Sequence, residues 1–268
     1  MTYSLEINVN DRKNQSKSFV LTNPTSVSRN ILYREGFKSS EAFYLPIVQS
    51  TPLKTNSGFI GDINKGGPCN VNVLSFCPHS LTHIETSSHI TNDQKIKITV
   101  KDLEPKLING LVFLLDCISE SAVNNKVLNW EFIRKKLDNL EIIPDILALK
   151  TKSSQLPEHY NFSGKNFISL GQKVSKSLTE KYPDIKVLIL DLPSADAESD
   201  TKLMSHKDFF LFKENQEKEN FSKQKAIIEL AHFGSLNQDY YFCMMTPTKI
   251  ETDAMITDIL FWNLKAKN

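Results

Sequence analysis

Residues 78–89 read PHSLTHIETSSH and contain three of the six histidines of this 268-residue chain. Imidazole nitrogens and a carboxylate oxygen crowded into one short segment are ligands that suit Zn²⁺ or Mn²⁺. The competing interpretation is a polar loop that happens to be rich in histidine. We interpret the segment as a candidate metal site and work outward from it.

The spacing of His79, His83, Glu85 and His89 predicts a bent segment. Their positions differ by even numbers, so an extended chain would point all four side chains to one face. Full extension would also separate His79 and His83 by about 13 Å, which is too far for one ion. A helical turn would bring this pair to about 6 Å. We therefore expect a turn over residues 79–83, followed by a short strand through Glu85.

The segment resembles the motif H-x-G-T-H-x-D-x-P-x-H of the cyclase-like metal-dependent hydrolases, which include bacterial kynurenine formamidases and isatin hydrolase. The matching positions are His79, Thr82, His83 and His89. Glu85 stands at the aspartate position, whereas Leu81 and Ser87 replace the glycine and the proline. A glycine in such a turn usually supplies a positive φ or a close backbone approach. A leucine with positive φ would be strained, so either the local path differs at Leu81 or glycine is not strictly required there.

Four further segments resemble the same family and follow in the same order. They are the apolar run with DLPSAD at 187–196, similar to D-x-P-S-x-D; HKDFFL at 206–211, similar to H-x-x-L-L; AIIEL at 226–230, similar to i-x-E-x-L; and PTKI at 247–250, similar to P-L-K-I. The resemblance runs from about residue 70 to the end and is weaker before it. It implies an α/β protein with a swivelling β/β/α-type fold and a mixed, partly parallel central sheet.

The resemblance also implies roles for individual residues. The expected metal ligands are His79, His83 and Glu85. His206 and Glu229 would either complete a second metal site or face a single metal and the substrate. His89 would transfer protons beside the metal-bound water, although a ligand role is the alternative. The loop containing Ser194 and Asp196 would be held against the site. Without the resemblance, His206 would be read as a helix-surface histidine.

Other metal-binding patterns are weaker. Glu229 and His232 form one Glu-x-x-His pair, a pattern of di-iron helix bundles, but such bundles need two pairs in an all-helical chain. His159 lies in a polar loop and is expected at the surface. Cys77 precedes His79 by two residues, and a small buried hydrophobic role is favoured over a ligand role.

Periodicity predicts a mixed secondary structure. Alternation over 3–9 and the run 18–21 indicate a hairpin, and residues 23–70 are read as long loops around a short helix that wall a pocket. The apolar runs 111–116, 146–149 and 187–190 are typical of strands buried on both faces. Helices are expected over 128–138 and 170–181, which implies a partly parallel sheet. The charged run 213–220 is read as a solvated insertion.

Composition limits the remaining classes. The length favours one domain, with residues 1–70 as a loop-rich N-terminal arm and hairpin and 71–268 as the metal-site core. A net charge of +1 argues against nucleic acid and anionic membranes as partners. No apolar run reaches the roughly 18 residues of a membrane span. The N-terminus lacks a signal-peptide pattern, and four scattered cysteines predict singly buried thiols in the cytoplasm.

The sequence therefore predicts a divalent-metal hydrolase of a small amide-type C–N bond, in a formamide or a cyclic amide. It would use one or two Zn²⁺ or Mn²⁺ ions and His89 as general acid and base. The alternatives are a cyclase or lyase activity on the same scaffold and a non-catalytic metal- or ligand-binding relative. The expected partners are a small-molecule substrate and further copies of the chain, in a homodimer or homotetramer.

Overall fold

The structure is a computed structural model that describes residues 5–31, 40–123, 126–210 and 225–267. Within these ranges, the strands are β1 (Leu5–Asn10), β2 (Ser16–Ser26), β3 (Gln49–Pro52), β4 (Asn72–Ser75), β5 (His83–Glu85), β6 (Asn109–Asp116), β7 (Val127–Leu128), β8 (Ile146–Lys150), β9 (Ser169–Leu170), β10 (Val187–Leu190), β11 (Ala226–Glu229), β12 (Asp239–Met245), β13 (Ala254–Ile256) and β14 (Ile259–Ala266). The helices are α1 (Pro105–Ile108), α2 (Ile118–Val123), α3 (Trp130–Asp138), α4 (Val174–Lys181) and α5 (Met204–Phe210). Short 3₁₀ turns are η1 (Ile63–Lys65), η2 (Pro78–Ser80), η3 (Ser87–His89), η4 (Val100–Asp102) and η5 (Lys152–Gln155).

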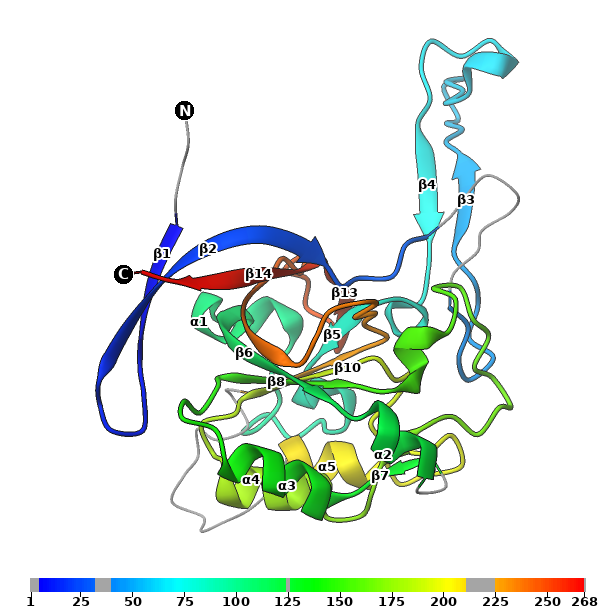
Figure 1. Ribbon diagram of the computed structural model, residues 1–268. Helices are drawn as coiled ribbons and strands as arrows, with labels where there is room; N and C mark the ends of the chain where they lie inside the picture. Colours follow the sequence, from blue (N-terminus) through cyan, green and yellow to red (C-terminus); the bar gives the residue numbers. More distant parts are fainter. Residues whose placement is uncertain (1–4, 32–39, 124–125, 211–224, 268) are drawn as a thin grey trace.

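In the described ranges, ten strands form one central sheet in the order β1-β2-β14-β12-β6-β8-β10-β11-β5-β13. Strands β6, β8, β10 and β11 run parallel, and antiparallel strands extend the sheet on both sides of them. Helices α3, α4 and α5 cover one face, and α1 packs on the other (Figure 1). The predicted α/β architecture with a mixed, partly parallel sheet is confirmed.

The three apolar runs form the middle of this sheet and are buried on both faces, as predicted. Leu147 and Leu188 pack toward the three helices, whereas their neighbours Ala148 and Ile189 pack into the opposite core. Because successive strand residues point to opposite faces, a strand between two layers must be apolar at every position. The sheet is thus a rigid partition between two hydrophobic cores.

The predicted N-terminal hairpin is present as β1 and β2, and β2 pairs with β14 to join the central sheet. The prediction of loops over 23–70 was only partly correct, because β3 pairs with β4 to make an arm of residues 49–75. This arm extends away from the body of the molecule (Figure 1). A Cβ at Gly61 would lie 2.4 Å from the carbonyl oxygen of Val71, so glycine permits the close approach inside the arm.

Helix α3 matches the predicted range closely, because Asn129 caps it and Ile133 and Leu137 bury one face. Helix α4 begins at Val174 rather than at residue 170, because residues 169–170 pair with β7 as β9. The predicted insertion at 213–220 lies outside the described residues. In the parts of the chain that the structure describes, no helix is both long and apolar enough to cross a membrane.

The prediction of four singly buried thiols was correct for only two of them. Cys117 and Cys243 are buried, Cys77 is half-buried and Cys69 is exposed. Burial raises the pKa of the Cys117 thiol well above its ordinary value, so this side chain is a neutral core residue. All four cysteines are free thiols.

Candidate metal centre

The segment 78–89 folds as the spacing predicts, with a 3₁₀ turn at Pro78–Ser80 followed by β5 at His83–Glu85. Leu81 has φ −131°, which is ordinary extended backbone, so the position does not require glycine. Ser87 replaces the motif proline with hydrogen bonds. Its Oγ donates to the carbonyl of Ile96 at 2.7 Å and accepts from the amide of Ile98 at 3.0 Å.

Strands β5 and β11 direct two carboxylates and a histidine to one face of the sheet. His83 and Glu85 are two residues apart on β5 and point to the same side, while Ile84 between them enters the opposite core. Glu229 on β11 stands directly opposite His83 in the antiparallel register. All three polar side chains are buried, with His83 and Glu85 at 0% exposure.

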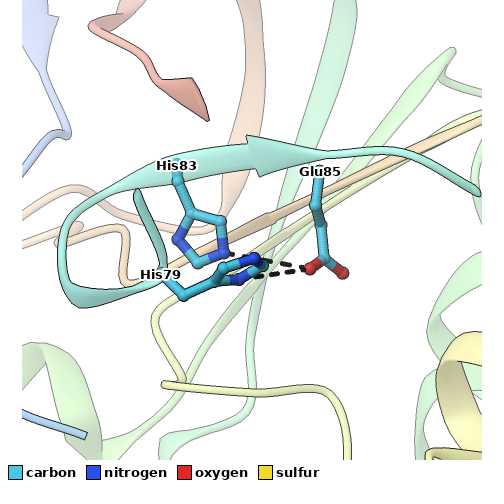
Figure 2. Close-up of side chains that lie close together, drawn as sticks. All are labelled: His79, His83 and Glu85. Carbon is cyan, nitrogen blue, oxygen red and sulfur yellow. Dashed lines mark ion pairs between the residues drawn. The ribbon is translucent and has the colours of Figure 1, made fainter. Parts of the chain in front are cut away.

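The residues His79, His83 and Glu85 converge below strand β5 (Figure 2). His79 Nδ1 lies 3.7 Å from Glu85 Oε2, and His83 Nε2 lies 3.9 Å from the same oxygen. The two imidazole rings are 4.6 Å apart at their centroids. The turn therefore brings the i and i+4 histidines together, as the sequence required for a shared ion.

Helix α5 adds His206 to the other oxygen of Glu85. His206 Nε2 lies 2.6 Å from Glu85 Oε1 and 3.3 Å from Glu229 Oε1, and the side chain is 1% exposed. The interpretation as a helix-surface histidine is therefore wrong. Glu229 Oε2 also lies 3.7 Å from His83 Nε2, so the two carboxylates stand between histidines from different elements. Glu85 has a nitrogen donor near each of its oxygens.

The outward nitrogens of two histidines are held by acceptors. His83 Nδ1 donates to the carbonyl oxygen of Leu81 at 2.8 Å, and His206 Nδ1 donates to Asp196 Oδ2 at 2.5 Å. Because a carbonyl or carboxylate oxygen only accepts, the proton sits on Nδ1 in each neutral ring. The Nε2 lone pair then faces the carboxylates, which is the arrangement found behind metal-bound histidines.

His89 lies at the more open edge of the cluster, with its side chain 24% exposed. Its Nε2 is 3.8 Å from Glu85 Oε2, and its Nδ1 is 3.2 Å from Asp253 Oδ2. The same Asp253 oxygen is 3.0 Å from His79 Nε2. Asp253 was not predicted from the sequence, because it stands three residues after the P-T-K-I segment and occupies no position of the motif. Only the pairing of β13 with β5 reveals its place.

Several buried ligand-type atoms make no hydrogen bond in this centre. They are His83 Nε2, His206 Nε2 and both carboxylate oxygens of Glu85. Buried polar groups are almost always satisfied, because leaving one unpaired costs about 1–3 kcal/mol. Nitrogen and carboxylate donors in this arrangement fit a divalent first-row metal. The unsatisfied atoms therefore match the expected ion.

Three overlapping groups have ligand atoms within 4.8 Å of one another: His79 with His83 and Glu85, His79 with His89 and Asp253, and Glu85 with His89 and His206. Among the described residues, neither Cys77, His159 nor His232 joins these groups. Glu229 lies on a strand, so the Glu-x-x-His helix pattern does not form. Metal ligation by the predicted residues stays a prediction that their proximity supports.

Electrostatics couple the buried charges in the metal-free centre. Burial by itself would lower the pKa of His206, but the charge of Glu85 and the hydrogen bond to Asp196 raise it well above its ordinary value. Burial would raise the pKa of Glu85, but the charge of His206, whose Nε2 lies 2.6 Å from Oε1, holds it well below its usual range. Imidazole protons thus balance the carboxylates, a role that a divalent cation would take over.

Comparison with known families agrees with this geometry. Residues 15–197 match the family model described as putative cyclase, and this range covers more than half of the chain. The chain belongs to this family. Among curated protein sequences, no significant match was found.

Solved structures of other proteins have a similar fold. A predicted metal-dependent hydrolase from Bacillus stearothermophilus has a TM-score of 0.60 at 18% identity, with 90% of this chain and 98% of that chain covered. Isatin hydrolase A from Labrenzia aggregata has a TM-score of 0.66 at 14% identity, with 90% and 93% covered. Isatin hydrolase A from Ralstonia solanacearum has a TM-score of 0.64 at 13% identity, with 90% and 91% covered.

Proposed function

We propose that this cyclase-family protein is a divalent-metal hydrolase of a small amide-type C–N bond, in a formamide or a cyclic amide. The observation that carries the proposal is the set of buried, unsatisfied ligand atoms around Glu85, with the partly exposed His89 beside them. Structural similarity to a predicted metal-dependent hydrolase and to isatin hydrolases supports the reaction class.

His79, His83 and Glu85 are the proposed ligands of the ion, which is Zn²⁺ or Mn²⁺. His206 and Glu229 would either complete a second metal site or face a single metal and the substrate. When bound, the metal supplies Lewis acidity that polarises a carbonyl group and lowers the pKa of a water molecule to about 7. The fully buried His83 and Glu85 keep their orientation because they stand on a central-sheet strand.

His89 is the proposed proton carrier. Its Nε2 faces the carboxylate cluster, and its partial exposure leaves one side of the ring accessible to a substrate. His89 Nε2 would take a proton from the attacking water and deliver it to the departing nitrogen, so the amine leaves neutral. General acid–base catalysis of this kind contributes about 10²–10⁴-fold to a rate. A ligand role for His89, in the group with Glu85 and His206, is the competing proposal.

The first experiment measures metal content and turnover together. Protein purified without chelator is analysed for Zn and Mn, and then assayed on a panel of formamides and lactams. Stoichiometric metal with turnover of an amide supports the hydrolase. Stoichiometric metal without turnover favours a binding protein, and ring closure or elimination on the same substrates favours the cyclase or lyase class that the family name indicates. Absence of bound metal together with no effect of added metal contradicts the proposal.

We further propose that the chain forms a homodimer or homotetramer through the arm of residues 49–75. The arm extends from the body of the molecule (Figure 1) and exposes Ile63, Val73 and Leu74 by 56%, 50% and 59%. Exposed apolar side chains on a projecting element favour contact with another protein surface. Sedimentation at the monomer mass of 30.5 kDa would contradict this assembly.

The proposed surroundings of the protein follow from its chemistry. Four free thiols, one of them exposed, favour a reducing compartment, and we propose the cytoplasm. A small molecule is the proposed substrate, in keeping with the small amide-type bond of the proposed reaction. The near-neutral charge supports neither nucleic acid nor a membrane surface as a partner. Fractionation of cells that express the tagged chain tests the location.

A further inference from the structure

Asp253 reaches the metal centre through strand pairing. Strand β13 lies antiparallel to β5, with Ala254 opposite Glu85. Thr86, the residue after Glu85, donates from its amide to the Asp253 carbonyl at 3.1 Å, while its hydroxyl lies 2.7 Å from the Ile98 carbonyl and 3.2 Å from that of Asp253. These bonds fix the backbone of Asp253 beside the segment that carries the motif.

The carboxylate of Asp253 contacts a hydroxyl and two histidines. Its Oδ1 accepts from the hydroxyl of Thr252 at 3.1 Å. Its Oδ2 faces both His79 Nε2 at 3.0 Å and His89 Nδ1 at 3.2 Å. One oxygen therefore bridges the proposed first ligand and the proposed proton carrier, and both histidines carry a proton on the nitrogen that faces Asp253.

The opposite nitrogens then carry lone pairs. In a neutral imidazole one nitrogen donates and the other accepts, so a proton on His79 Nε2 leaves Nδ1 free. A proton on His89 Nδ1 likewise leaves Nε2 free. Both free nitrogens point at Glu85 Oε2, at 3.7 Å and 3.8 Å. Asp253 thus accepts hydrogen bonds from His79 and His89. In the same way, the Leu81 carbonyl accepts from His83, and Asp196 accepts from His206.

We propose that Asp253 is a positioning residue that selects the tautomers of His79 and His89, so that one presents Nδ1 to the metal and the other presents Nε2 as the proton acceptor. This inference rests on the proposed function for the catalytic role of His89, but the tautomers themselves do not depend on it. The side chain of Asp253 is 40% exposed, whereas Glu85 is fully buried. An outer position of this kind suits a residue that acts through the ligands.

The direct test reads the tautomers of the metal-free protein. Burial by itself would lower the pKa of His89, but the hydrogen bond to Asp253 and the charge of Glu85 raise it above the ordinary imidazole value of about 6.5. Nitrogen-15 NMR of histidine-labelled protein is therefore recorded at rising pH until the rings are neutral, where it distinguishes a protonated Nδ1 from a protonated Nε2. We expect His89 to carry its proton on Nδ1 in the wild type. In Asp253→Ala and Asp253→Asn, the form protonated on Nε2 should appear. Glu251→Gln is the matched control, because it removes a charge two residues away that pairs with Lys101 at 3.5 Å.

A wild-type His89 protonated on Nε2 would overturn the proposal, as would a tautomer unchanged in both variants. A spectrum of Asp253→Asn that superimposes on the wild type outside the centre shows that the variant is folded. Metal titration supplies a second readout. We expect Asp253→Ala to bind the same number of Zn²⁺ ions with about 10–100-fold lower affinity. Loss of one whole equivalent would make Asp253 a ligand and overturn the positioning role.

Kinetics separate this inference from the proposed function. If the wild type turns over an amide, Asp253→Ala should lower kcat about 10–100-fold with KM nearly unchanged. Asp253→Glu should restore part of this loss, and Glu251→Gln should match the wild type. If the wild type turns over an amide and Asp253→Ala does so at the same rate, the positioning role is contradicted, whereas the proposed hydrolase function is not. If the wild type has no amide activity, the tautomer and metal measurements still decide the role of Asp253.

Discussion

Removal of a single imidazole from β5 gives the sharpest test of the metal centre. His83 is fully buried, its Nε2 has no hydrogen-bond partner, and this atom lies 3.9 Å and 3.7 Å from Glu85 and Glu229. The variant His83→Ala deletes the donor and leaves the two carboxylates without it. We expect stoichiometric metal in the wild type and none in the variant, because the other donors cannot replace a fully enclosed nitrogen.

The size of the effect on stability follows from mass action. An ion present at 100 times its Kd and bound only to the folded state stabilises the protein by about 2.7 kcal/mol. For a chain of this length, 1 kcal/mol shifts the Tm by about 2–4 °C, so saturating metal should raise the wild-type Tm by about 5–10 °C. His83→Ala should lose this rise. His159→Ala, which removes an exposed histidine of a distant loop, should keep it.

The assay is thermal unfolding with excess Zn²⁺ or Mn²⁺ and with chelator, beside elemental analysis of the same samples. A wild-type Tm that does not respond to any divalent first-row ion would refute the reasoning, and so would a His83→Ala protein that keeps both its metal and the shift. Equal loss of the shift in His159→Ala would show that the effect is not specific to the centre.

Three other predictions concern the same segment and its partners. His89→Ala should keep the metal while turnover falls about 10²–10⁴-fold, and loss of the metal would instead make His89 a ligand. In the metal-free protein, the raised pKa of His206 and the lowered pKa of Glu85 stabilise the fold most between about pH 4.3 and 6.5. The metal-free Tm should therefore fall as the pH rises through the folded-state pKa of His206. Excess metal should reverse this trend, because metal binding needs neutral imidazole. A metal-free Tm that does not change with pH would contradict the proposed coupling of His206 and Glu85. Leu81→Gly should destabilise the protein by at least about 2 kcal/mol in chemical denaturation, because the leucine is buried and its φ is already extended; a stabilised variant would show that the motif glycine is required here.

Local pattern was enough to predict several elements from the sequence. The need to bring His79 and His83 within reach of one ion predicted the turn, because an extended chain holds them too far apart. The even spacing of His83 and Glu85 predicted the short strand, because side-chain direction follows from the period of the backbone. The continuous apolar runs predicted the central strands, since a strand between two cores has no solvent side. The periodicity of Ile133 and Leu137 predicted α3 for the same kind of reason. The resemblance of five short segments added the family, which the match over residues 15–197 shows.

Other features were decided only by the tertiary structure. The arm of residues 49–75 was missed because its two strands are short, and most of their side chains lack an alternating apolar pattern. Helix α4 starts late because residues 169–170 are taken by pairing with β7. Both depend on a partner strand that the local sequence does not specify.

The contacts within the candidate metal centre are the clearest case of features that local sequence does not specify. The sequence by itself determined that His79, His83 and Glu85 share a short segment, because their distances along the chain are bounded by covalent geometry. It did not determine that Glu229 stands opposite His83, that His206 is buried over Glu85, or that Asp253 joins His79 to His89. These contacts join residues more than one hundred positions apart. The order and register of β11, β5 and β13, together with the packing of α5 on the sheet, bring them together, and both are set by the packing of the whole sheet.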